Sequence, residues 1–360
     1  MSSMLAAGLL LRRKGFQSLQ ILSLNTNPGF EDIELWRAHS TVITALDPLW
    51  PQKSLIAKIR CLLRVSKNFD IVLFHYDARL AALYGLIRAI SHSKRGLVFQ
   101  GLFCDISSYS LARLNMRTVF RNCASFLFYC LLVRTMNAVI VHTSAEVDLY
   151  SKCFSVTKSR FIFVPYFHYA KTQDFTCIGA SIQTPTSREA NILAIGRHRD
   201  FDCFTQALTE SPWQGVIVAG DSDRQELDGK VPANVTVHYE VSRTEYLNHI
   251  AKSTIVVIPL CPNRWQRALG QIAMFEAIRM QKPVIAAETF QLRDYASNNE
   301  VLYYRPGDAK HLREQIVRLV DDTDLQSRLA KNARTRLLAE FTRERYVAQL
   351  IAVCQSCSQS

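Results

Sequence analysis

The sequence lacks a hydrophobic run long enough to cross a lipid bilayer. A spanning helix needs about 20 consecutive apolar residues. The longest apolar run near the middle of the chain, Phe126–Val133, is much shorter than that and ends at Arg134. We therefore predict that the chain does not cross a membrane.

The ten cysteines lack the paired spacing of a metal site. Only Cys354 and Cys357 stand close together, and a single CxxC without a second pair or nearby histidines is weak evidence for zinc or redox chemistry. No export signal is recognisable. Scattered cysteines in such a chain favour a reducing compartment, so we expect a cytoplasmic protein.

Positive charge is plentiful, and it is concentrated in the first half. The net charge is +12; residues 1–170 hold 20 Lys and Arg against 9 Asp and Glu, whereas the remainder holds 23 against 22. Such asymmetry predicts an anionic partner for the basic half, such as a membrane surface, a phosphorylated ligand or nucleic acid. Because no nucleic-acid recognition motif is present, we expect no nucleic-acid partner.

Short buried strands alternate with helices throughout, which predicts parallel sheets covered by helices. The predicted strands are Leu19–Leu24, Ile71–Phe74, Leu97–Phe99, Ala138–Val141 and Phe161–Val164, then Ile192–Ile195, Gly215–Ala219, Val235–His238, Ile255–Leu260, Val284–Ala287 and Val301–Tyr304. The predicted helices include Arg79–Ile90, Leu111–Arg134, Phe201–Thr209, Arg243–Lys252, Gly270–Met280, Ala309–Asp321, Asp324–Glu340 and Glu344–Gln355.

This order predicts an α/β fold with two doubly wound, Rossmann-like domains facing a cleft. The first domain would span 1–170 and the second 191–342, joined by a polar linker at 171–190; a helix within 343–360 would cross back to the first domain. The segment Met4–Lys14 has the pattern of a first helix without the strand that should precede it. Either the chain starts too late or its sheet lacks an edge strand, and we favour the former.

The segment Ala268–Asp308 contains a pattern typical of nucleotide binding. A turn at Gly270 precedes a predicted helix, whose free N–H groups and positive dipole end would attract phosphate. Glu276 follows about 9 Å along that helix, at roughly 1.5 Å per residue. A carboxylate there could bind the paired hydroxyls of a ribose. A buried strand, Pro283–Ala287, and a polar loop that holds Arg293 and Asp294 follow the predicted helix. The alternative interpretation is an ordinary βαβ unit with a surface glutamate.

A second anion-binding pattern follows the strand Ile192–Ile195. Gly196 stands at the end of this strand, and Arg197 and Arg199 come directly before the next predicted helix. Guanidinium groups form forked hydrogen bonds with phosphate oxygens. The alternative interpretation is that both arginines are solvated loop residues.

Taken in order, several segments resemble the donor-binding domain of GT-B glycosyltransferases of the family-four-like group (glycosyl transferases group 1). The resemblance covers about residues 138–350 and rests on AVIVHTSAEVDLY, FIFVP, GRHRDF, VIVAGD, VSRTEYLNHIAKSTIVVIPL, GQIAMFEAIRMQKPVIAAE and RDYASNNEVLYYRPGDAKHLREQI. It implies a transferase of the hexosyl type that uses no metal or cofactor.

The resemblance also implies roles for particular residues. Arg197 or Arg199 would hold the donor diphosphate, and Glu276 would bind the ribose. The backbone at Gly270, Gln271 and Ile272 would face the phosphates. The segment Tyr239–Ser242, including Tyr239 and Val241, would line the base.

The chain departs from the family pattern at several positions. The glutamate that would contact the donor sugar is replaced by Ala268, and Gln271 would take over some of its contacts. Asp202 replaces a usual lysine, which leaves Arg199 as the substitute cation, and Gln281 replaces a common glycine. The glycine-rich acceptor loop of the first domain is absent.

The candidates for a catalytic base lie in the first domain. Asp105 and His75 both follow predicted strands, where the cleft should lie. In an inverting enzyme of this architecture, such a group removes the proton of the acceptor hydroxyl. Both could instead cap turns or contact backbone, and a retaining enzyme would need no base because phosphate oxygens of the donor assist.

The predicted helix Leu111–Arg134 carries Arg113, Arg117 and Arg121 at spacings of four, followed by bulky apolar residues. This pattern indicates either a basic amphipathic helix that contacts anionic lipid or a core helix with one solvated face. With the basic first domain, it favours peripheral association with the inner face of the membrane.

Together these patterns predict a glycosyltransferase of polysaccharide or cell-surface glycan biosynthesis. The donor would be a UDP- or GDP-sugar, and the acceptor a glycan or a lipid-linked intermediate. The alternative, suggested by Ala268 and the short N-terminus, is a catalytically impaired relative that binds nucleotides or glycans.

Overall fold

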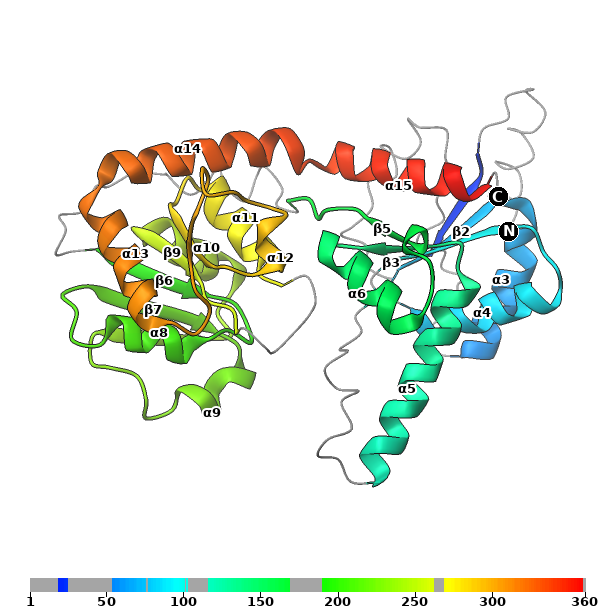
Figure 1. The fold of residues 1–360 in the computed structure, drawn as a ribbon, viewed down its shortest axis with the longest axis horizontal. Helices are drawn as coiled ribbons and strands as arrows, with labels where there is room; N and C mark the ends of the chain where they lie inside the picture. The colour runs from blue at the N-terminus through cyan, green and yellow to red at the C-terminus, as the bar shows by residue number, and fades with distance from the viewer. Residues whose placement is uncertain are drawn as a thin grey trace. The chain divides into compact units, whose positions relative to one another are not determined.

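The computed structural model describes residues 19–24, 54–75, 77–100, 102, 116–168, 190–261 and 269–358. Contacts divide the chain into two compact units. Unit 1 comprises Met1–Pro165 together with Glu344–Ser360, and unit 2 comprises Tyr166–Arg343. Each unit contains one parallel sheet flanked by helices (Figure 1).

The sheet of unit 1 has the strand order β1-β2-β3-β4-β5, with every neighbouring pair parallel. Nearly all of its strand residues are buried, as expected when helices cover both faces of a parallel sheet. The order follows the chain without reversal among the described strands. The strands are β1 (Ile21–Leu24), β2 (Ile71–His75), β3 (Gly96–Gln100), β4 (Ala138–Val141) and β5 (Phe161–Phe163).

The helices of unit 1 begin at recognisable caps. The Asp77 carboxylate accepts a hydrogen bond from the Leu80 N–H at the start of α4, and Thr143 forms a capping box with Glu146 at the start of α6. The C-terminal helix α15 belongs to this unit, where the Tyr346 hydroxyl contacts the side chain of Gln100. The helices are α3 (Leu55–Val65), α4 (Ala78–Ile90), α5 (Met116–Thr135), α6 (Ser144–Phe154) and α15 (Arg343–Ser358).

The sheet of unit 2 has the order β11-β10-β9-β6-β7-β8. The chain runs outward from β6 to β8, then returns to the other side of β6 with β9. This reversal makes the sheet doubly wound, and ligands of such sheets bind where the reversal occurs, at the carboxyl ends of the strands. The strands are β6 (Asn191–Ile195), β7 (Gln214–Ala219), β8 (Val235–Tyr239), β9 (Ile255–Ile258), β10 (Val284–Ala287) and β11 (Leu302–Tyr304).

Helices pack in pairs around the sheet of unit 2. Helix α13 lies against α8, and α14 lies against α11 (Figure 1). The pattern of buried residues on α13, Leu312, Ile316 and Leu319, places one apolar stripe toward the core. The helices are α8 (Phe201–Leu208), α9 (Arg224–Leu227), α10 (Arg243–Lys252), α11 (Gln271–Arg279), α12 (Phe290–Arg293), α13 (Ala309–Asp321) and α14 (Thr323–Glu340).

One predicted segment differs from the structure in an informative way. The prediction of a loop at Arg293 was wrong, because Phe290–Arg293 form the short helix α12. Burial explains this turn of helix: Leu292 is fully buried in the core of unit 2, and a four-residue helix has too little sequence to show a periodic pattern. The strand β9 also ends earlier than predicted, at Ile258, because Pro259 has no N–H to donate.

Some predictions concern residues that the structure does not describe. They are the helix Met4–Lys14, Ala268, Asp105 and most of the linker, at 171–189; the side chains of Arg113, Arg117 and Arg121 also lie outside the described part. Within the described part, no helix is long and apolar enough to span a membrane.

Candidate functional site

The start of α11 forms an uncapped helix end at the reversal point of the second sheet. Gly270 precedes the helix with a φ of 89°, in the left-handed region, and as the N-cap residue it has no side chain to cap the first turn. A Cβ atom at Gly270 would lie 3.1 Å from Ile258 Cγ2 and 3.3 Å from Leu292 Cδ2, so both conformation and space favour glycine. The first N–H groups of the helix have no intrahelical acceptor and can bind an anion.

Two predicted residues in this first turn differ in their surroundings. Gln271 is buried, and its Nε2 donates a hydrogen bond to the Gln291 carbonyl at 2.9 Å, which ties α11 to α12. Its amide is therefore used within the protein. Ile272 is 46% exposed and stands beside the helix end. Of the two, Ile272 is the side chain that a ligand at this turn would meet.

Glu276 lies in the second turn of α11 and is almost fully buried. Its Oε1 atom pairs with Arg243 Nη1 at 2.5 Å. The Tyr246 hydroxyl also hydrogen-bonds this carboxylate; burial, with the neighbouring negative charge as a second cause, raises the pKa of Tyr246. Arg243 and Tyr246 stand three residues apart on α10, on one face of the helix. A carboxylate has several lone pairs, so one that is paired with a guanidinium can still accept hydrogen bonds from hydroxyl groups.

Arg199 belongs to the same cluster as Glu276. Its side chain is buried, and its Nε donates to the Ile195 carbonyl at 3.1 Å. Burial lowers the pKa of Arg199, and the nearby Tyr246 and Asp223 oppose that effect. Tyr246 thus lies between Arg199 and Glu276, which are far apart in sequence. The guanidinium folds back over Gly196, where a Cβ would lie 2.5 Å from it, so this turn also needs glycine.

Arg197 has a different environment from Arg199. Its side chain is 64% exposed and crosses Gly220. Its Nη2 atom bonds both carboxylate oxygens of Glu240, at 2.9 and 2.7 Å. An exposed pair of this kind contributes little to stability and could exchange for a ligand phosphate. The structure therefore distinguishes an inner arginine, Arg199, from an outer one, Arg197.

The loop after β6 is held in place by Asp223. This buried carboxylate accepts hydrogen bonds from the His198 N–H at 2.9 Å and the Gly220 N–H at 3.1 Å. Asp200 then caps α8 through the Cys203 N–H. The backbone that presents both arginines is fixed by these contacts. Asp202, at the position of the usual lysine, is exposed.

The predicted base-binding segment follows β8. Tyr239 is half-buried with the Arg224 guanidinium 4.1 Å from its ring centroid, and Val241 is half-buried. Ser242 caps α10 and forms a capping box with Glu245. This segment therefore leads directly into the helix that supplies Arg243 to the cluster.

In unit 1, His75 ends β2 in a buried position. Its Nε2 lies 2.9 Å from the Ser23 hydroxyl. Burial lowers the pKa of His75 to about 4, against the opposing effect of a hydrogen bond with Gln100. The imidazole is therefore neutral at pH 7, and only 4% of its surface is exposed. Asp105, the other candidate base, lies outside the described residues.

A further polar group at the carboxyl end of β4 was not predicted as a site. Glu146 Oε2 accepts hydrogen bonds from the N–H groups of His142 and Thr143, at 3.0 and 2.9 Å. Burial raises the pKa of Glu146 to about 7 and lowers that of His142 to about 4. The segment HTSAE contains the capping-box spacing, which is the signal that could have identified this group.

Arg243 and Tyr246 were also absent from the predicted site residues. Their spacing on one helix face is visible in the sequence, but the partner of that face is not. Across the described ranges, no three His, Cys, Asp or Glu side chains gather closely enough to hold a metal ion.

Residues 189–322 match the family described as Glycosyl transferases group 1. The match lies wholly within unit 2. The matched range includes the Arg199–Glu276 cluster and the α11 helix end. A comparison of the sequence with curated proteins gives no match.

Solved structures that share its GT-B fold resemble almost the full length of the chain. Sucrose-phosphate synthase from Thermosynechococcus elongatus has a TM-score of 0.64 at 15% identity, over 94% of this chain and 98% of that one. HepE from Anabaena, in complex with UDP and glucose, has a TM-score of 0.62 at 14% identity, over 94% and 100%. A glycosyltransferase from Rickettsia africae has a TM-score of 0.63 at 11% identity, over 95% and 99%.

Proposed function

We propose that this protein transfers a sugar from a nucleotide-sugar donor to a glycan or lipid-linked acceptor. One observation carries the proposal: the uncapped start of α11 and the buried carboxylate of Glu276 stand about two turns apart at the reversal point of the second sheet. A nucleoside diphosphate presents a phosphate and a ribose diol at a similar separation. The group 1 family match supports this reading.

In this proposal, the donor diphosphate lies at the first N–H groups of α11, close to Arg199. The helix end and the guanidinium would stabilise the charge that develops on the leaving nucleotide. Glu276 would accept hydrogen bonds from the ribose hydroxyls. Arg243 and the Tyr246 hydroxyl already contact this carboxylate, so the ribose diol would share it with them.

The nucleotide is a UDP- or GDP-sugar in this proposal. HepE, a structural neighbour, has been solved in complex with UDP and with UDP-glucose. That observation belongs to HepE and supports a uridine nucleotide here. The base would lie beside Tyr239 and Val241, at the start of α10.

The acceptor would bind unit 1. Its basic composition suits a polyanionic or membrane-proximal acceptor, as in polysaccharide assembly. A base is needed only if the reaction inverts the anomeric centre, and His75 or Asp105 would then supply it. A retaining reaction would use the donor phosphate oxygens instead.

A nucleotide-release assay over UDP-, GDP- and ADP-sugars tests the proposal. We expect turnover with a uridine or guanosine donor, and a loss of kcat/KM of at least about tenfold in Glu276→Ala, because the ribose loses hydrogen bonds to a charged partner. Glu314→Ala is the matched control, since Glu314 is exposed on α13. Turnover that survives Glu276→Ala unchanged would refute the site assignment.

The same assay separates the rival function, a relative that binds nucleotides without transferring a sugar. Its sequence support is Ala268, which replaces a sugar-contacting glutamate. Nucleotide binding with no release from any donor, in the presence of candidate acceptors, would favour that rival.

A further inference from the structure

A pocket lies along the edge strand β11, and none of its lining residues belongs to the Arg199–Glu276 cluster. Its volume is about 810 Å³, within the range of small-molecule sites. We call it the β11 pocket. Its lining comes from β11, the loop that precedes it, α13 and α14, together with Glu288 after β10 and Arg293 on α12.

Helix α13 presents one continuous polar face to this pocket. His311, Gln315 and Arg318 line it at spacings of four and three residues, which places them on the same side of the helix. His311 Nδ1 accepts a hydrogen bond from the Arg305 N–H at 3.0 Å, so the neutral ring carries its proton on Nε2. The face therefore offers an imidazole donor, an amide and a guanidinium.

Helix α14 supplies the opposite wall. Arg328 and Asn332 line the pocket one helical turn apart, with Leu325 and Leu329 beneath them. Asn332 Nδ2 donates to the Asn299 carbonyl at 3.1 Å, which leaves its side-chain oxygen as an acceptor. The two helices thus bring one arginine each to the same pocket.

The two arginines are cations without counter-charges among the residues that the structure describes. Arg318 and Arg328 make no hydrogen bond or ion pair there. The third arginine of the lining, Arg293, is already bonded to Glu288 and to Asn298 Oδ1. Two uncompensated guanidinium groups around one pocket favour an anionic ligand.

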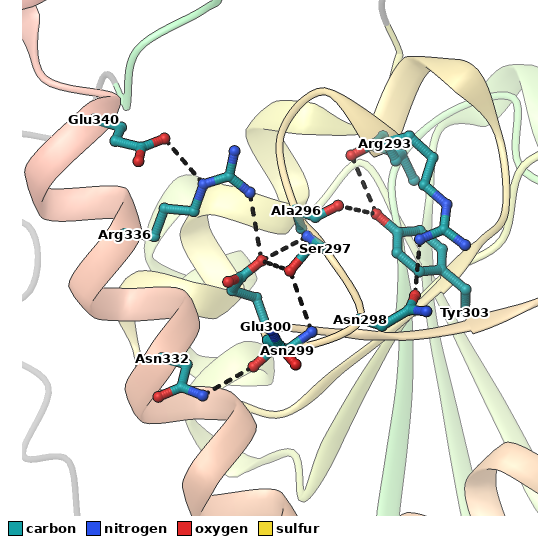
Figure 2. A network of polar contacts seen from close by, with 11 residues as sticks. Arg293, Ala296, Ser297, Asn298, Asn299, Glu300, Tyr303, Asn332, Arg336 and Glu340 are labelled. Atoms are coloured by element: carbon teal, nitrogen blue, oxygen red, sulfur yellow. Dashed lines mark hydrogen bonds and ion pairs between the residues drawn. The ribbon is translucent and has the colours of Figure 1, made fainter.

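The loop that closes one end of the pocket is rigidly held. Glu300 accepts hydrogen bonds from the backbone and hydroxyl of Ser297, and it pairs with Arg336 on α14 (Figure 2). Arg336 in turn bonds Glu340 at 2.9 Å. These contacts fix the position of Asn298 and Asn299 before any ligand arrives, which lowers the cost of binding.

The side-chain amides of the lining indicate the chemistry of the rest of the ligand. Asn298, Asn332 and Gln315 present donors and acceptors suited to hydroxyl groups. Nucleotide bases commonly stack on an aromatic ring, but the Tyr303 ring of the lining is already covered by the Arg293 guanidinium, at 3.8 Å from its centroid, and the His311 imidazole is bonded to the Arg305 N–H. The lining suits a polar, hydroxylated anion better than a nucleotide.

We propose that the β11 pocket binds a sugar phosphate, with the phosphate between Arg318 and Arg328 and the sugar hydroxyls against the amides of Gln315, Asn298 and Asn332. This site goes beyond the proposed transfer reaction, because its residues are separate from the donor cluster. It would let a phosphorylated sugar bind while the donor site is occupied.

Calorimetric titration of the full chain at low ionic strength tests the proposal. The probes are glucose 6-phosphate, glucose 1-phosphate, inorganic phosphate and glucose. We expect at least one sugar phosphate to bind about tenfold or more tightly than inorganic phosphate, and glucose not to bind detectably. Equal affinity for inorganic phosphate would mean an anion site without sugar recognition and would overturn the proposal, as would the absence of binding by both sugar phosphates.

Variants locate the binding. Arg318→Ala and Arg328→Ala should each lower the affinity for the sugar phosphate by about tenfold or more, because each removes a charge-assisted hydrogen bond. Arg334→Ala, on α14 but outside the lining, should stay within about twofold. Both pocket arginines are exposed, so their loss should not prevent folding. Unchanged affinity in both pocket variants would overturn the proposal.

A last variant separates this site from the donor site. Arg199→Ala should leave the affinity for the sugar phosphate within about twofold, whatever it does to nucleotide binding. A loss as large as that of Arg328→Ala would place the sugar phosphate in the donor cluster and contradict the proposal.

Discussion

At the scale of single residues, two arginines two positions apart have different physical environments. Arg199 is buried against the Ile195 carbonyl and next to Tyr246, whereas Arg197 is exposed and paired with Glu240. The sequence predicted both as phosphate ligands but could not rank them, because the direction of each side chain depends on the loop that Asp223 holds. The same limit applies to Arg243, whose partner Glu276 lies on another helix.

This difference predicts unequal effects on nucleotide binding. Arg199→Met should weaken the binding of UDP or GDP by about tenfold or more, because it removes the buried, preorganised cation of the Arg199–Glu276 cluster. Arg197→Met should weaken it by about threefold or less, since the exposed guanidinium already has a carboxylate partner. Fluorescence or calorimetric titration measures both. Equal losses in the two variants would contradict the distinction between the inner and the outer arginine.

Glu146 predicts a pH dependence of stability in unit 1. Burial raises its pKa from 4.5 to about 7, so the folded state binds this proton more tightly than the unfolded state. The resulting stability is complete below about pH 4.5 and is lost as the pH rises through 7. Between pH 5.5 and 8.5, the free energy of unfolding of the wild type should fall by about 2 kcal/mol relative to that of Glu146→Gln.

Urea unfolding of both proteins at the two pH values checks this expectation. The glutamine variant supplies the control, because it keeps a side-chain oxygen as acceptor and has no carboxyl group to titrate. A difference in unfolding free energy that does not change with pH would show that Glu146 titrates normally.

At the scale of elements, sequence patterns predicted the strands and the long helices well. The strand Ala138–Val141 and the helix Ala309–Asp321 have the predicted bounds, because buried β-branched runs and a clear apolar stripe leave few alternatives. The short helix α12 was missed, since tertiary burial of Leu292 holds it in place. It is nevertheless part of the site's support, because the Gln291 carbonyl anchors Gln271.

The turn before α11 predicts a strong requirement for glycine. Gly270→Ala should lower the free energy of unfolding by about 2–3 kcal/mol, because it adds left-handed strain and crowds Ile258. Gly229→Ala is the matched control: Gly229 also has a positive φ, of 71°, but has open space around its Cβ position. Gly229→Ala should lower the free energy of unfolding by only about 1 kcal/mol.

Denaturant unfolding of the two glycine variants measures these costs. Equal destabilisation would mean that the contact with Ile258 relaxes freely. A nucleotide affinity that is unchanged in Gly270→Ala would further argue against a phosphate at this helix end.

At the scale of the whole molecule, the chain consists of two α/β units, and its fold is that of GT-B enzymes. The alternation of strands and helices sufficed to predict this class. The β11 pocket could not be predicted in the same way, because its lining comes from an edge strand and from several helices and loops that meet only in the folded unit.

The basic composition of residues 1–170 predicts binding to anionic membranes. The full chain should co-sediment with phosphatidylglycerol vesicles at low salt and dissociate at high salt, because the attraction is screened. Replacing Arg113, Arg117 and Arg121 by alanine should weaken binding by roughly a hundredfold, at about 1 kcal/mol per arginine. If the protein does not co-sediment with such vesicles at low salt, the prediction of membrane binding is wrong.

Calorimetric titration of UDP and GDP into the wild type, Glu276→Ala and Glu314→Ala tests most directly whether a nucleotide binds at the start of α11. We expect at least one nucleotide to bind the wild type and Glu314→Ala with equal affinity, and to bind Glu276→Ala at least about tenfold more weakly. Equal affinity in all three proteins, or no binding of either nucleotide to the wild type, would contradict the proposed site.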